Sequence, residues 1–309
     1  MTAAASDAPA PRRARRSGWW RARQLQGVAY AMPTLIFVGV FFVLPLLLVF
    51  RMSLSEWPLL TGDRGFNVPE NYESITRNSL FWPAVLFTIQ YTIVVTVLLV
   101  GLGLLLAMLV QEGRRWVAFL RTAFLLPVAL GLASASLLFW GFYSNSIGPL
   151  GPTLQTLGLI DEPLSFFGSP TSALMSTVFL IVWKYAGLYM IILLVGLQAI
   201  PQEIYEQAAI DGANRRQIFR RITLPLLRPA LALSLLLCVT GSLLAFDQFF
   251  ILTKGGPDNS TVTVVQLIYR EAFQRQNLGT AAAVSVFLLA ALLVLNGLWF
   301  RTLRRGAEG

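Results

Sequence analysis

The sequence of 309 residues contains no histidine and a single cysteine, Cys238. Histidine is the commonest metal ligand and the usual proton carrier near neutral pH, so its absence excludes histidine-based metal sites and acid–base relays. A single cysteine excludes a disulfide within the chain, and its place inside an apolar run predicts a buried structural thiol. We therefore expect no catalytic residues, no metal site and no enzyme activity in this chain.

Charged residues are also scarce. They make up 13% of the chain, whereas hydrophobic residues make up 56%. A soluble domain typically carries about a quarter charged residues, so the deficit indicates that lipid is the solvent. The net charge of +9, taken alone, is compatible with nucleic acid. The basic residues lie between apolar blocks, however, so we expect membrane lipid and not nucleic acid beside them.

Six apolar blocks are long enough to cross a bilayer, which takes about 20 residues of helix. They predict an all-α, polytopic membrane protein with six transmembrane helices. Pro33 and Pro45 interrupt the first block and Gly241 the fifth, which membrane helices tolerate where neighbours satisfy the freed backbone groups. The predicted spans are 28–50, 84–110, 122–143, 173–197, 229–252 and 280–300.

The placement of lysine and arginine predicts the orientation. Most of the 24 basic residues lie in 1–27, 111–121, 198–228 and 301–309, and the segment 144–172 has none. Cytoplasmic segments carry the excess of these residues in membrane proteins. Both termini are therefore predicted to be cytoplasmic.

The ends of the chain are predicted to lie outside a transmembrane domain that covers 27–303. The first 26 residues are rich in Ala, Pro and Arg and predict a disordered basic cytoplasmic tail, and 304–309 form a second short tail. The first apolar block is too long for a signal peptide, and no small-x-small cleavage site follows it. We expect it to remain as an anchor.

The segment between the fourth and fifth blocks carries signals for two short helices. Pro201 suits the first turn of a helix, because its missing N–H has no partner there anyway. Gly212 supplies the positive φ that ends this helix. Asp211 is expected to cap a second helix that begins at Ala213 or Asn214.

The small side chains of this segment allow another backbone to approach. Ala208, Ala209, Gly212 and Ala213 would let another protein dock on the first helix and its turn. Alternatively, the surrounding arginines would hold an amphipathic helix against anionic lipid. Helical periodicity alone leaves both interpretations open.

The same segment resembles the EAA loop of bacterial ABC-importer permeases. Gln207 departs from the family, which usually has Ala there. The matching residues are Glu206, Ala208, Asp211, Gly212 and Ala213, then Phe219 and the run Ile222-Thr223-Leu224-Pro225. The resemblance implies a coupling helix that seats in a cleft of a separate ATPase subunit. The residues it assigns to ATPase coupling are Glu206, Ala208, Ala209, Asp211, Gly212 and Ala213.

A second resemblance points to carbohydrate importers of the maltose and glycerol-phosphate type. It lies in the turn Gly255-Gly256-Pro257 after the fifth block, and in Gly187, Gly196-Leu197-Gln198 and Ile200-Pro201. It implies a bacterial plasma-membrane protein that moves a sugar-like solute by ATP-coupled alternating access. The implied partners are a second related permease, two ATPase subunits and an extracytoplasmic solute-binding protein. No Gly-rich loop followed by Lys-Ser or Lys-Thr occurs, so ATP and Mg²⁺ are expected on the ATPase and no cofactor on this chain.

Polar residues inside spans are costly and default to functional hypotheses. Lys184 is the formal charge in the middle of the fourth block, with Tyr185 and Tyr189 close by, and Asp247 and Gln248 lie toward the end of the fifth. Aromatic faces beside hydrogen-bonding groups suit a sugar ring, so these five residues are candidates for the solute pathway.

Each candidate also has a structural interpretation. Lys184 would snorkel or pair with Asp247 to fix helix packing, and the tyrosines would form an interfacial belt. The pair Gly101-x-Gly103 predicts close helix packing and not a nucleotide contact. Two other classes of protein stay open as alternatives: a secondary transporter or channel subunit without an ATPase, and a membrane-embedded enzyme.

Overall fold

A computed structural model describes residues 28, 30–111, 115–144, 148–158, 160 and 165–307. These residues are helical and contain no strand, only two isolated β-bridges, which confirms the all-α class over the described chain. Four described helices are long and apolar enough to cross a membrane, and up to six spans result if two bent pairs are each counted as one. The predicted tail at 1–26 lies outside the described residues.

The chain divides into two compact units, Met1–Arg51 and Met52–Gly309. In the first unit a helix begins at Tyr30 and continues through a π-helical turn, η1 (Gly39–Val43), into α2 (Leu44–Ser53). The span Tyr30–Ser53 has a hydropathy of 2.6, and none of its apolar window is buried. This is the composition of a helix whose whole surface suits lipid.

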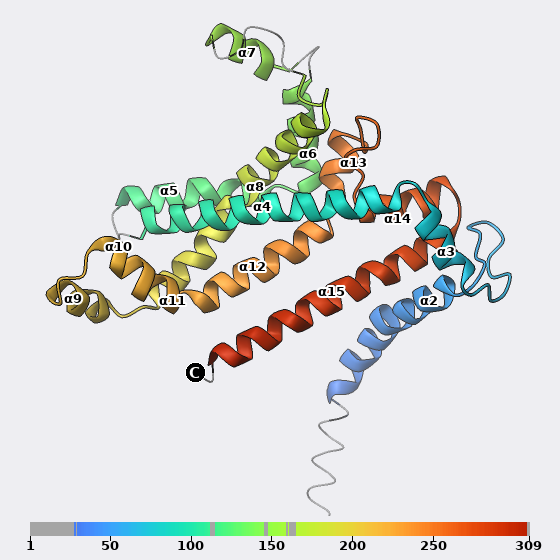
Figure 1. Ribbon diagram of the computed structural model, residues 1–309, viewed down its shortest axis with the longest axis horizontal. Helices are drawn as coiled ribbons and strands as arrows, with labels where there is room; N and C mark the ends of the chain where they lie inside the picture. The colour runs from blue at the N-terminus through green and yellow to red at the C-terminus, as the bar shows by residue number, and fades with distance from the viewer. Residues whose placement is uncertain are drawn as a thin grey trace, which may run out of the picture. The chain divides into compact units, whose positions relative to one another are not determined.

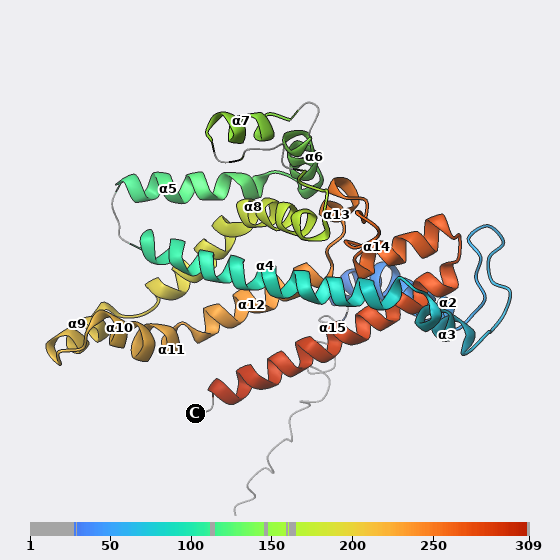
Figure 2. The same cartoon turned by 45° about the horizontal axis from the view of Figure 1, so that its top comes forward.

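Three continuous helices of the second unit agree with predicted spans. They are α4 (Phe81–Leu109), α8 (Pro170–Gln198) and α15 (Leu278–Ala307). The start of α8 is set by a capping box in which the side chains of Ser169 and Ser172 each accept from the other's backbone N–H. Figures 1 and 2 show α4 running beside α8 and α12 (Arg228–Leu243), which together hold the largest buried apolar cluster.

Glycines let these helices approach closely. A Cβ on Gly103 of α4 would lie 2.9 Å from Cβ of Tyr189 on α8, so close packing is confirmed at this position. Gly101 has no atom within 4 Å of such a Cβ, and the prediction is wrong there. On α8 itself, a Cβ on Gly187 would collide with the backbone carbonyl of Phe124.

The third predicted span, 122–143, is not a continuous helix. The chain forms α5 (Arg115–Leu125), the 3₁₀ turn η2 (Leu126–Ala129) and α6 (Leu132–Tyr143), with a bend of 95° between Trp116–Ala129 and Leu132–Tyr143. Pro127 lacks the N–H that would continue an α-helix, and Gly131 is extended at ψ 144°. The predicted span over these residues therefore corresponds to a bent pair of helices that is long and apolar enough to count as one span.

The fifth predicted span, 229–252, is also interrupted. Helix α12 ends at Leu243, and α13 (Asp247–Leu252) begins after three non-helical residues. The freed carbonyl of Ala245 accepts a hydrogen bond of 2.8 Å from the Thr263 hydroxyl, so this break is satisfied by a distant segment. The interruption falls after Leu243 and not at Gly241, the residue expected to interrupt this block, which lies within α12.

Shorter helices complete the second unit. The predicted turn at Gly255-Gly256-Pro257 is confirmed, and Arg270 holds it by donating to the carbonyl of Lys254 at 3.0 Å and to Asn259 Oδ1 at 2.7 Å. Other short helices of this unit are α3 (Glu70–Arg77), α7 (Leu150–Thr156), α14 (Val264–Tyr269) and the π-helical η4 (Arg270–Gln274).

We predict that Gly187→Ala lowers the stability of the purified chain in detergent by about 1–3 kcal/mol, because the new methyl group meets backbone atoms of α5 that cannot rotate away. The midpoint of thermal unfolding, followed by size-exclusion chromatography after heating, measures the effect. Gly101→Ala is the matched control in another span and should leave the midpoint unchanged or slightly higher. Equal midpoints for the two variants would contradict this account of the α5–α8 contact.

Candidate functional site

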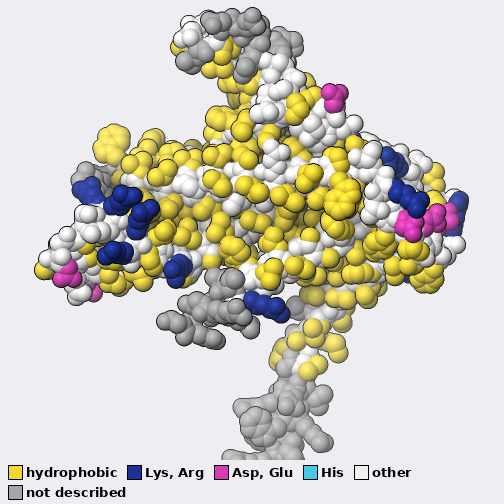
Figure 3. All heavy atoms as spheres, viewed as in Figure 1, with side chains coloured by type: hydrophobic (Ala, Val, Ile, Leu, Met, Phe, Trp, Pro, Cys, Tyr) yellow, Lys and Arg dark blue, Asp and Glu magenta, His cyan; other side chains and the backbone are white. Residues whose placement is uncertain are grey.

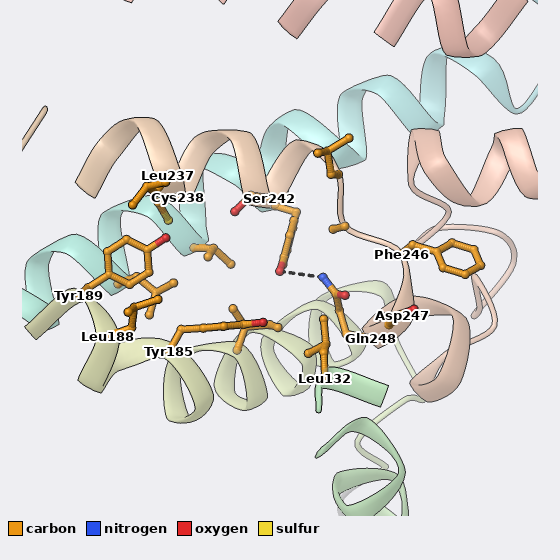
Figure 4. Close-up of a pocket in the computed structure, with 17 residues that line it drawn as sticks. Leu132, Tyr185, Leu188, Tyr189, Leu237, Cys238, Ser242, Phe246, Asp247 and Gln248 are labelled. Carbon is orange, nitrogen blue, oxygen red and sulfur yellow. Dashed lines mark hydrogen bonds between the residues drawn. The ribbon is translucent and has the colours of Figure 1, made fainter. Parts of the chain in front are cut away.

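A cavity of about 360 Å³ lies between α4, α8, α12 and α13. Figure 4 shows side chains from these helices converging on it. Tyr185, Tyr189, Asp247 and Gln248 line it, so four of the five predicted pathway residues lie together. Lys184 is not among the lining residues.

Gln248 is the most constrained polar group of the cavity. Its side chain is 3% exposed, and its Nε2 donates to the Tyr91 hydroxyl at 3.1 Å, the dashed line in Figure 4. Its Oε1 has no hydrogen-bond partner among the described residues. A buried acceptor without a partner is rare in native proteins and needs an explanation.

Tyr91 was missed by the sequence analysis. It lies on α4, more than 150 residues from Gln248 in the sequence, and is 1% exposed. Thr88, Thr92 and Thr96 carry hydroxyls in the same apolar block, so no local signal in the sequence distinguishes Tyr91. Cys238 was predicted to be a buried thiol, which is confirmed, and it too lines the cavity.

The break between α12 and α13 shapes one side of the cavity. Irregular backbone at membrane depth is tolerated where it lines a cavity or is buried in protein. Leu244, Ala245 and Phe246 form the break and all three line the cavity. Asp247 follows in the first turn of α13, where a carboxylate is favourable, and its side chain is exposed.

Lys184 lies at the other helix break, between η2 and α6. Its side chain is 2% exposed, and its ammonium donates to the carbonyls of Pro127 and Val128, both at 3.3 Å, and of Leu130. The Pro127 carbonyl also accepts from the N–H of Leu130 at 3.2 Å, whereas the carbonyls of Val128 and Leu130 lie where the helix ends and backbone acceptors need partners from outside it. Nζ also lies 5.0 Å from the ring centroid of Tyr185. The structure therefore joins Lys184 to the backbone at the break, whereas the predicted alternative partner, Asp247, lines the cavity.

The segment between α8 and α12 forms the two helices that the sequence predicts. They are α9 (Gln202–Ile210) and α10 (Arg215–Ile218), the latter continued by η3 (Phe219–Thr223) and α11 (Leu224–Leu226). Gly212 has φ of +78°, which confirms its role in ending α9. The predicted cap is wrong: Asn214, not Asp211, accepts from the N–H of Gln217 at 2.9 Å and caps α10.

The six residues assigned to ATPase coupling lie on one continuous stretch, from α9 to the residue before the cap. Glu206, Ala209, Asp211 and Gly212 are exposed, and Ala208 and Ala213 are half-buried. Figure 3 shows Lys and Arg side chains gathered at the end of the molecule where α9 to α11 lie.

Ile210 is a further residue of this stretch that the sequence analysis did not single out. The side chain of this large apolar residue is 85% exposed at the end of α9. It lies beside the small residues of this stretch, and an exposed apolar side chain in such a place is typical of a surface on which another protein docks.

Comparisons with known proteins agree over most of the chain. Residues 10–305 match the family described as binding-protein-dependent transport system inner membrane component. The chain is 34% identical to the trehalose/maltose transport system permease protein MalF of Thermococcus litoralis, over 87% of this chain and 90% of that one. It is 31% identical to the multiple sugar-binding transport system permease protein MsmF of Streptococcus mutans, over 87% and 92%.

Two solved structures share the fold. A bacterial alginate ABC transporter in complex with an alginate pentasaccharide-bound periplasmic protein has a TM-score of 0.79 at 23% identity, covering 93% of this chain and 97% of that one. A bacterial ABC transporter involved in the import of the acidic polysaccharide alginate has a TM-score of 0.76 at 23% identity, covering 93% and 98%.

We predict that Lys184→Met lowers the free energy of unfolding of the purified chain by about 1–3 kcal/mol or more. This is the cost of leaving one buried polar group without a partner. The thermal midpoint in detergent measures it. Lys254→Met is the matched control, because Lys254 is the chain's other lysine and its side chain is exposed. If Lys184→Met unfolds at the same temperature as Lys254→Met, the ammonium does not hold the break.

Proposed function

This chain belongs to the family of binding-protein-dependent transport system inner membrane components, and on that premise we propose that it is one transmembrane half of an ATP-driven importer for a sugar-like solute. As a family member it is a multi-pass protein of the plasma membrane. Sugar systems among its relatives, at 31% and 34% identity, support the class of solute.

One observation carries the proposal: two helices join the cavity to the exposed segment α9–α11. Helix α8 carries Tyr185 and Tyr189 at the cavity and ends at Gln198, and three residues separate it from α9. Helix α12 begins at Arg228, directly after α11 and Leu227, and carries Cys238 and Ser242 at the cavity. A force on α9 therefore reaches the cavity through two rigid helices, as alternating access by coupled motion requires.

In this mechanism the segment α9–α11 seats on a separate ATPase. ATP and Mg²⁺ bind to the ATPase pair, whose closure moves α9 and with it the ends of α8 and α12. Glu206, Ala208, Ala209, Asp211, Gly212 and Ala213 form the surface that receives this motion, with Ile210 as its apolar centre. No bond of the solute is made or broken, so the chain acts as a transport subunit and not as an enzyme.

The cavity is proposed to hold the solute during transfer. Tyr185 and Tyr189 offer aromatic faces for a sugar ring, and Asp247 and Gln248 accept hydrogen bonds from its hydroxyls. A second, related permease supplies the other half of the pathway. A solute-binding protein delivers the solute to the segments 144–172 and 253–279. The alginate transporter with its periplasmic protein supports such a partner.

Orientation gives a direct prediction, with both termini in the cytoplasm and the segment 54–69 outside. With the permease produced without the ATPase that would cover Ile210, a membrane-impermeant maleimide added to intact cells should label the Phe66→Cys variant, whereas Ile210→Cys should be labelled only after lysis. Both side chains are well exposed, and the natural Cys238 is buried, so the background is low. Labelling of Ile210→Cys in intact cells would contradict the orientation.

Docking of the ATPase gives a second prediction. Ile210→Asp should reduce the ATPase that co-purifies with the permease in detergent at least about tenfold, because a buried unpaired charge replaces an apolar anchor. Phe66→Asp is the matched control, since Phe66 is 77% exposed on the segment assigned to the other side of the membrane. ATPase recovery that is unchanged in Ile210→Asp, or absent even from the unaltered permease, would refute the importer assignment.

A further inference from the structure

The charge of the solute is not fixed by family membership. Relatives include a trehalose/maltose system, and one structural neighbour serves an acidic polysaccharide. The groups that line the cavity therefore have to decide whether an anion or an uncharged sugar is accepted. This inference rests on the proposed function, because it treats the cavity as the place that the solute occupies.

Among the described residues, negative charge is the only formal charge that this chain places on the cavity wall. Of the 17 residues that line it, Asp247 alone is charged, and its side chain is exposed. No lysine or arginine reaches the wall. A carboxylate, phosphate or sulfonate entering this space would meet a like charge, with no cation of this chain to offset the repulsion.

Lys184 is the basic residue next to the cavity wall in the sequence, but its ammonium does not line the cavity. It precedes Tyr185, a wall residue, yet its ammonium is bound to three carbonyls at the η2 break. Turning it toward the solute would take the side-chain donor away from the partly buried carbonyls of Val128 and Leu130, which is unfavourable. The lysine is thus committed to the fold and not available to an anion.

The buried neutral groups point the same way. A single hydrogen bond joins Gln248 Nε2 to the oxygen of the Tyr91 hydroxyl. It leaves Gln248 Oε1 as an unpaired acceptor and leaves the hydrogen of the Tyr91 hydroxyl as a donor. An ionised carboxylate or phosphate group has only acceptors and cannot satisfy Oε1, so only a hydroxyl of the solute can do so. A sugar hydroxyl both donates and accepts, so it satisfies both members of the pair.

From these observations we infer that the cavity takes a hydroxyl-rich solute without negative charge and rejects acidic sugars. Asp247 and Gln248 Oε1 accept from hydroxyls of the solute, and the Tyr91 hydroxyl donates to one. Lys184 sets this preference indirectly, by being held at the helix break.

The test uses the complete transporter in proteoliposomes, with its partner permease, ATPases and binding protein. ATP-driven uptake is measured for the neutral sugars maltose, trehalose, lactose and cellobiose and for the anionic probes digalacturonate and glycerol 3-phosphate. We expect at least one neutral probe to be taken up at least about tenfold faster than either anion. Comparable or faster uptake of an anion overturns the inference but leaves the importer assignment intact. Absence of ATP-driven uptake of every probe removes the proposed function, and the inference with it.

Variants at two residues of the cavity wall, Asp247 and Gln248, test whether the preference for neutral sugars arises in this cavity or in the binding protein. Asp247→Asn, at an exposed site that does not endanger folding, should slow uptake of the neutral sugar roughly three- to tenfold, because a charged acceptor becomes a neutral one. If the site were built for an anion, the same variant would speed uptake. An unchanged or higher rate therefore overturns the inference.

The second comparison is at Gln248. Gln248→Glu keeps an acceptor at Oε1 and should retain more uptake of the neutral sugar than Gln248→Met, which has a similar volume and no acceptor. A site for anions predicts the opposite order, because the glutamate adds negative charge. Basal ATPase activity and the thermal midpoint of each variant show whether it is folded. If neither Gln248 variant is folded, the uptake rate of Asp247→Asn alone decides whether the inference holds.

Discussion

A polar backbone group inside a bilayer must find its hydrogen-bond partner within the protein, and the structure depends on how this is done at two helix breaks. At the first break the ammonium of Lys184 binds the carbonyls of Pro127, Val128 and Leu130. At the second, the hydroxyl of Thr263 binds the carbonyl of Ala245. Both partners are far from the breaks in sequence, so each break exists only in the folded chain. Each also leads into residues of the cavity wall, Leu132 after the first and Asp247 after the second.

Helix α8 connects most of these features. It carries Lys184 toward the first break, Tyr185 and Tyr189 toward the cavity, and Gly187 against the backbone of α5. A continuous helix fixes the spacing of these side chains, because its backbone bonds are all made within the segment. Its length of 29 residues also reaches from the capping box at Ser169 to the start of α9. One rigid element therefore couples the break, the cavity and the exposed segment.

The features that the sequence predicted correctly have local causes. The apolar blocks of α4, α8 and α15 reflect the thickness of the bilayer, and the end of α9 reflects the need for positive φ at Gly212. The breaks were missed because mean hydropathy does not change across them. Pro127 and Gly131 were visible local signals for the first break, whereas nothing in Leu244-Ala245-Phe246 indicates the second. The cap of α10 was misplaced for a local reason as well, since both Asp211 and Asn214 are good capping residues and only the position of the helix start distinguishes them.

The same limit explains why Lys184 was ambiguous in the sequence. A lysine beside two tyrosines inside a span fits a solute site and fits a structural role, and both interpretations respect the cost of burying charge. What separates them is the distance from Nζ to three carbonyls that lie more than 50 residues away. Those carbonyls are available to Lys184 because the helix breaks within the third span. The break therefore supplies acceptors for the buried ammonium, and the lysine supplies a donor to the backbone at the break. With Lys184 held at the break, Asp247 is the only charged residue among the described residues that line the cavity.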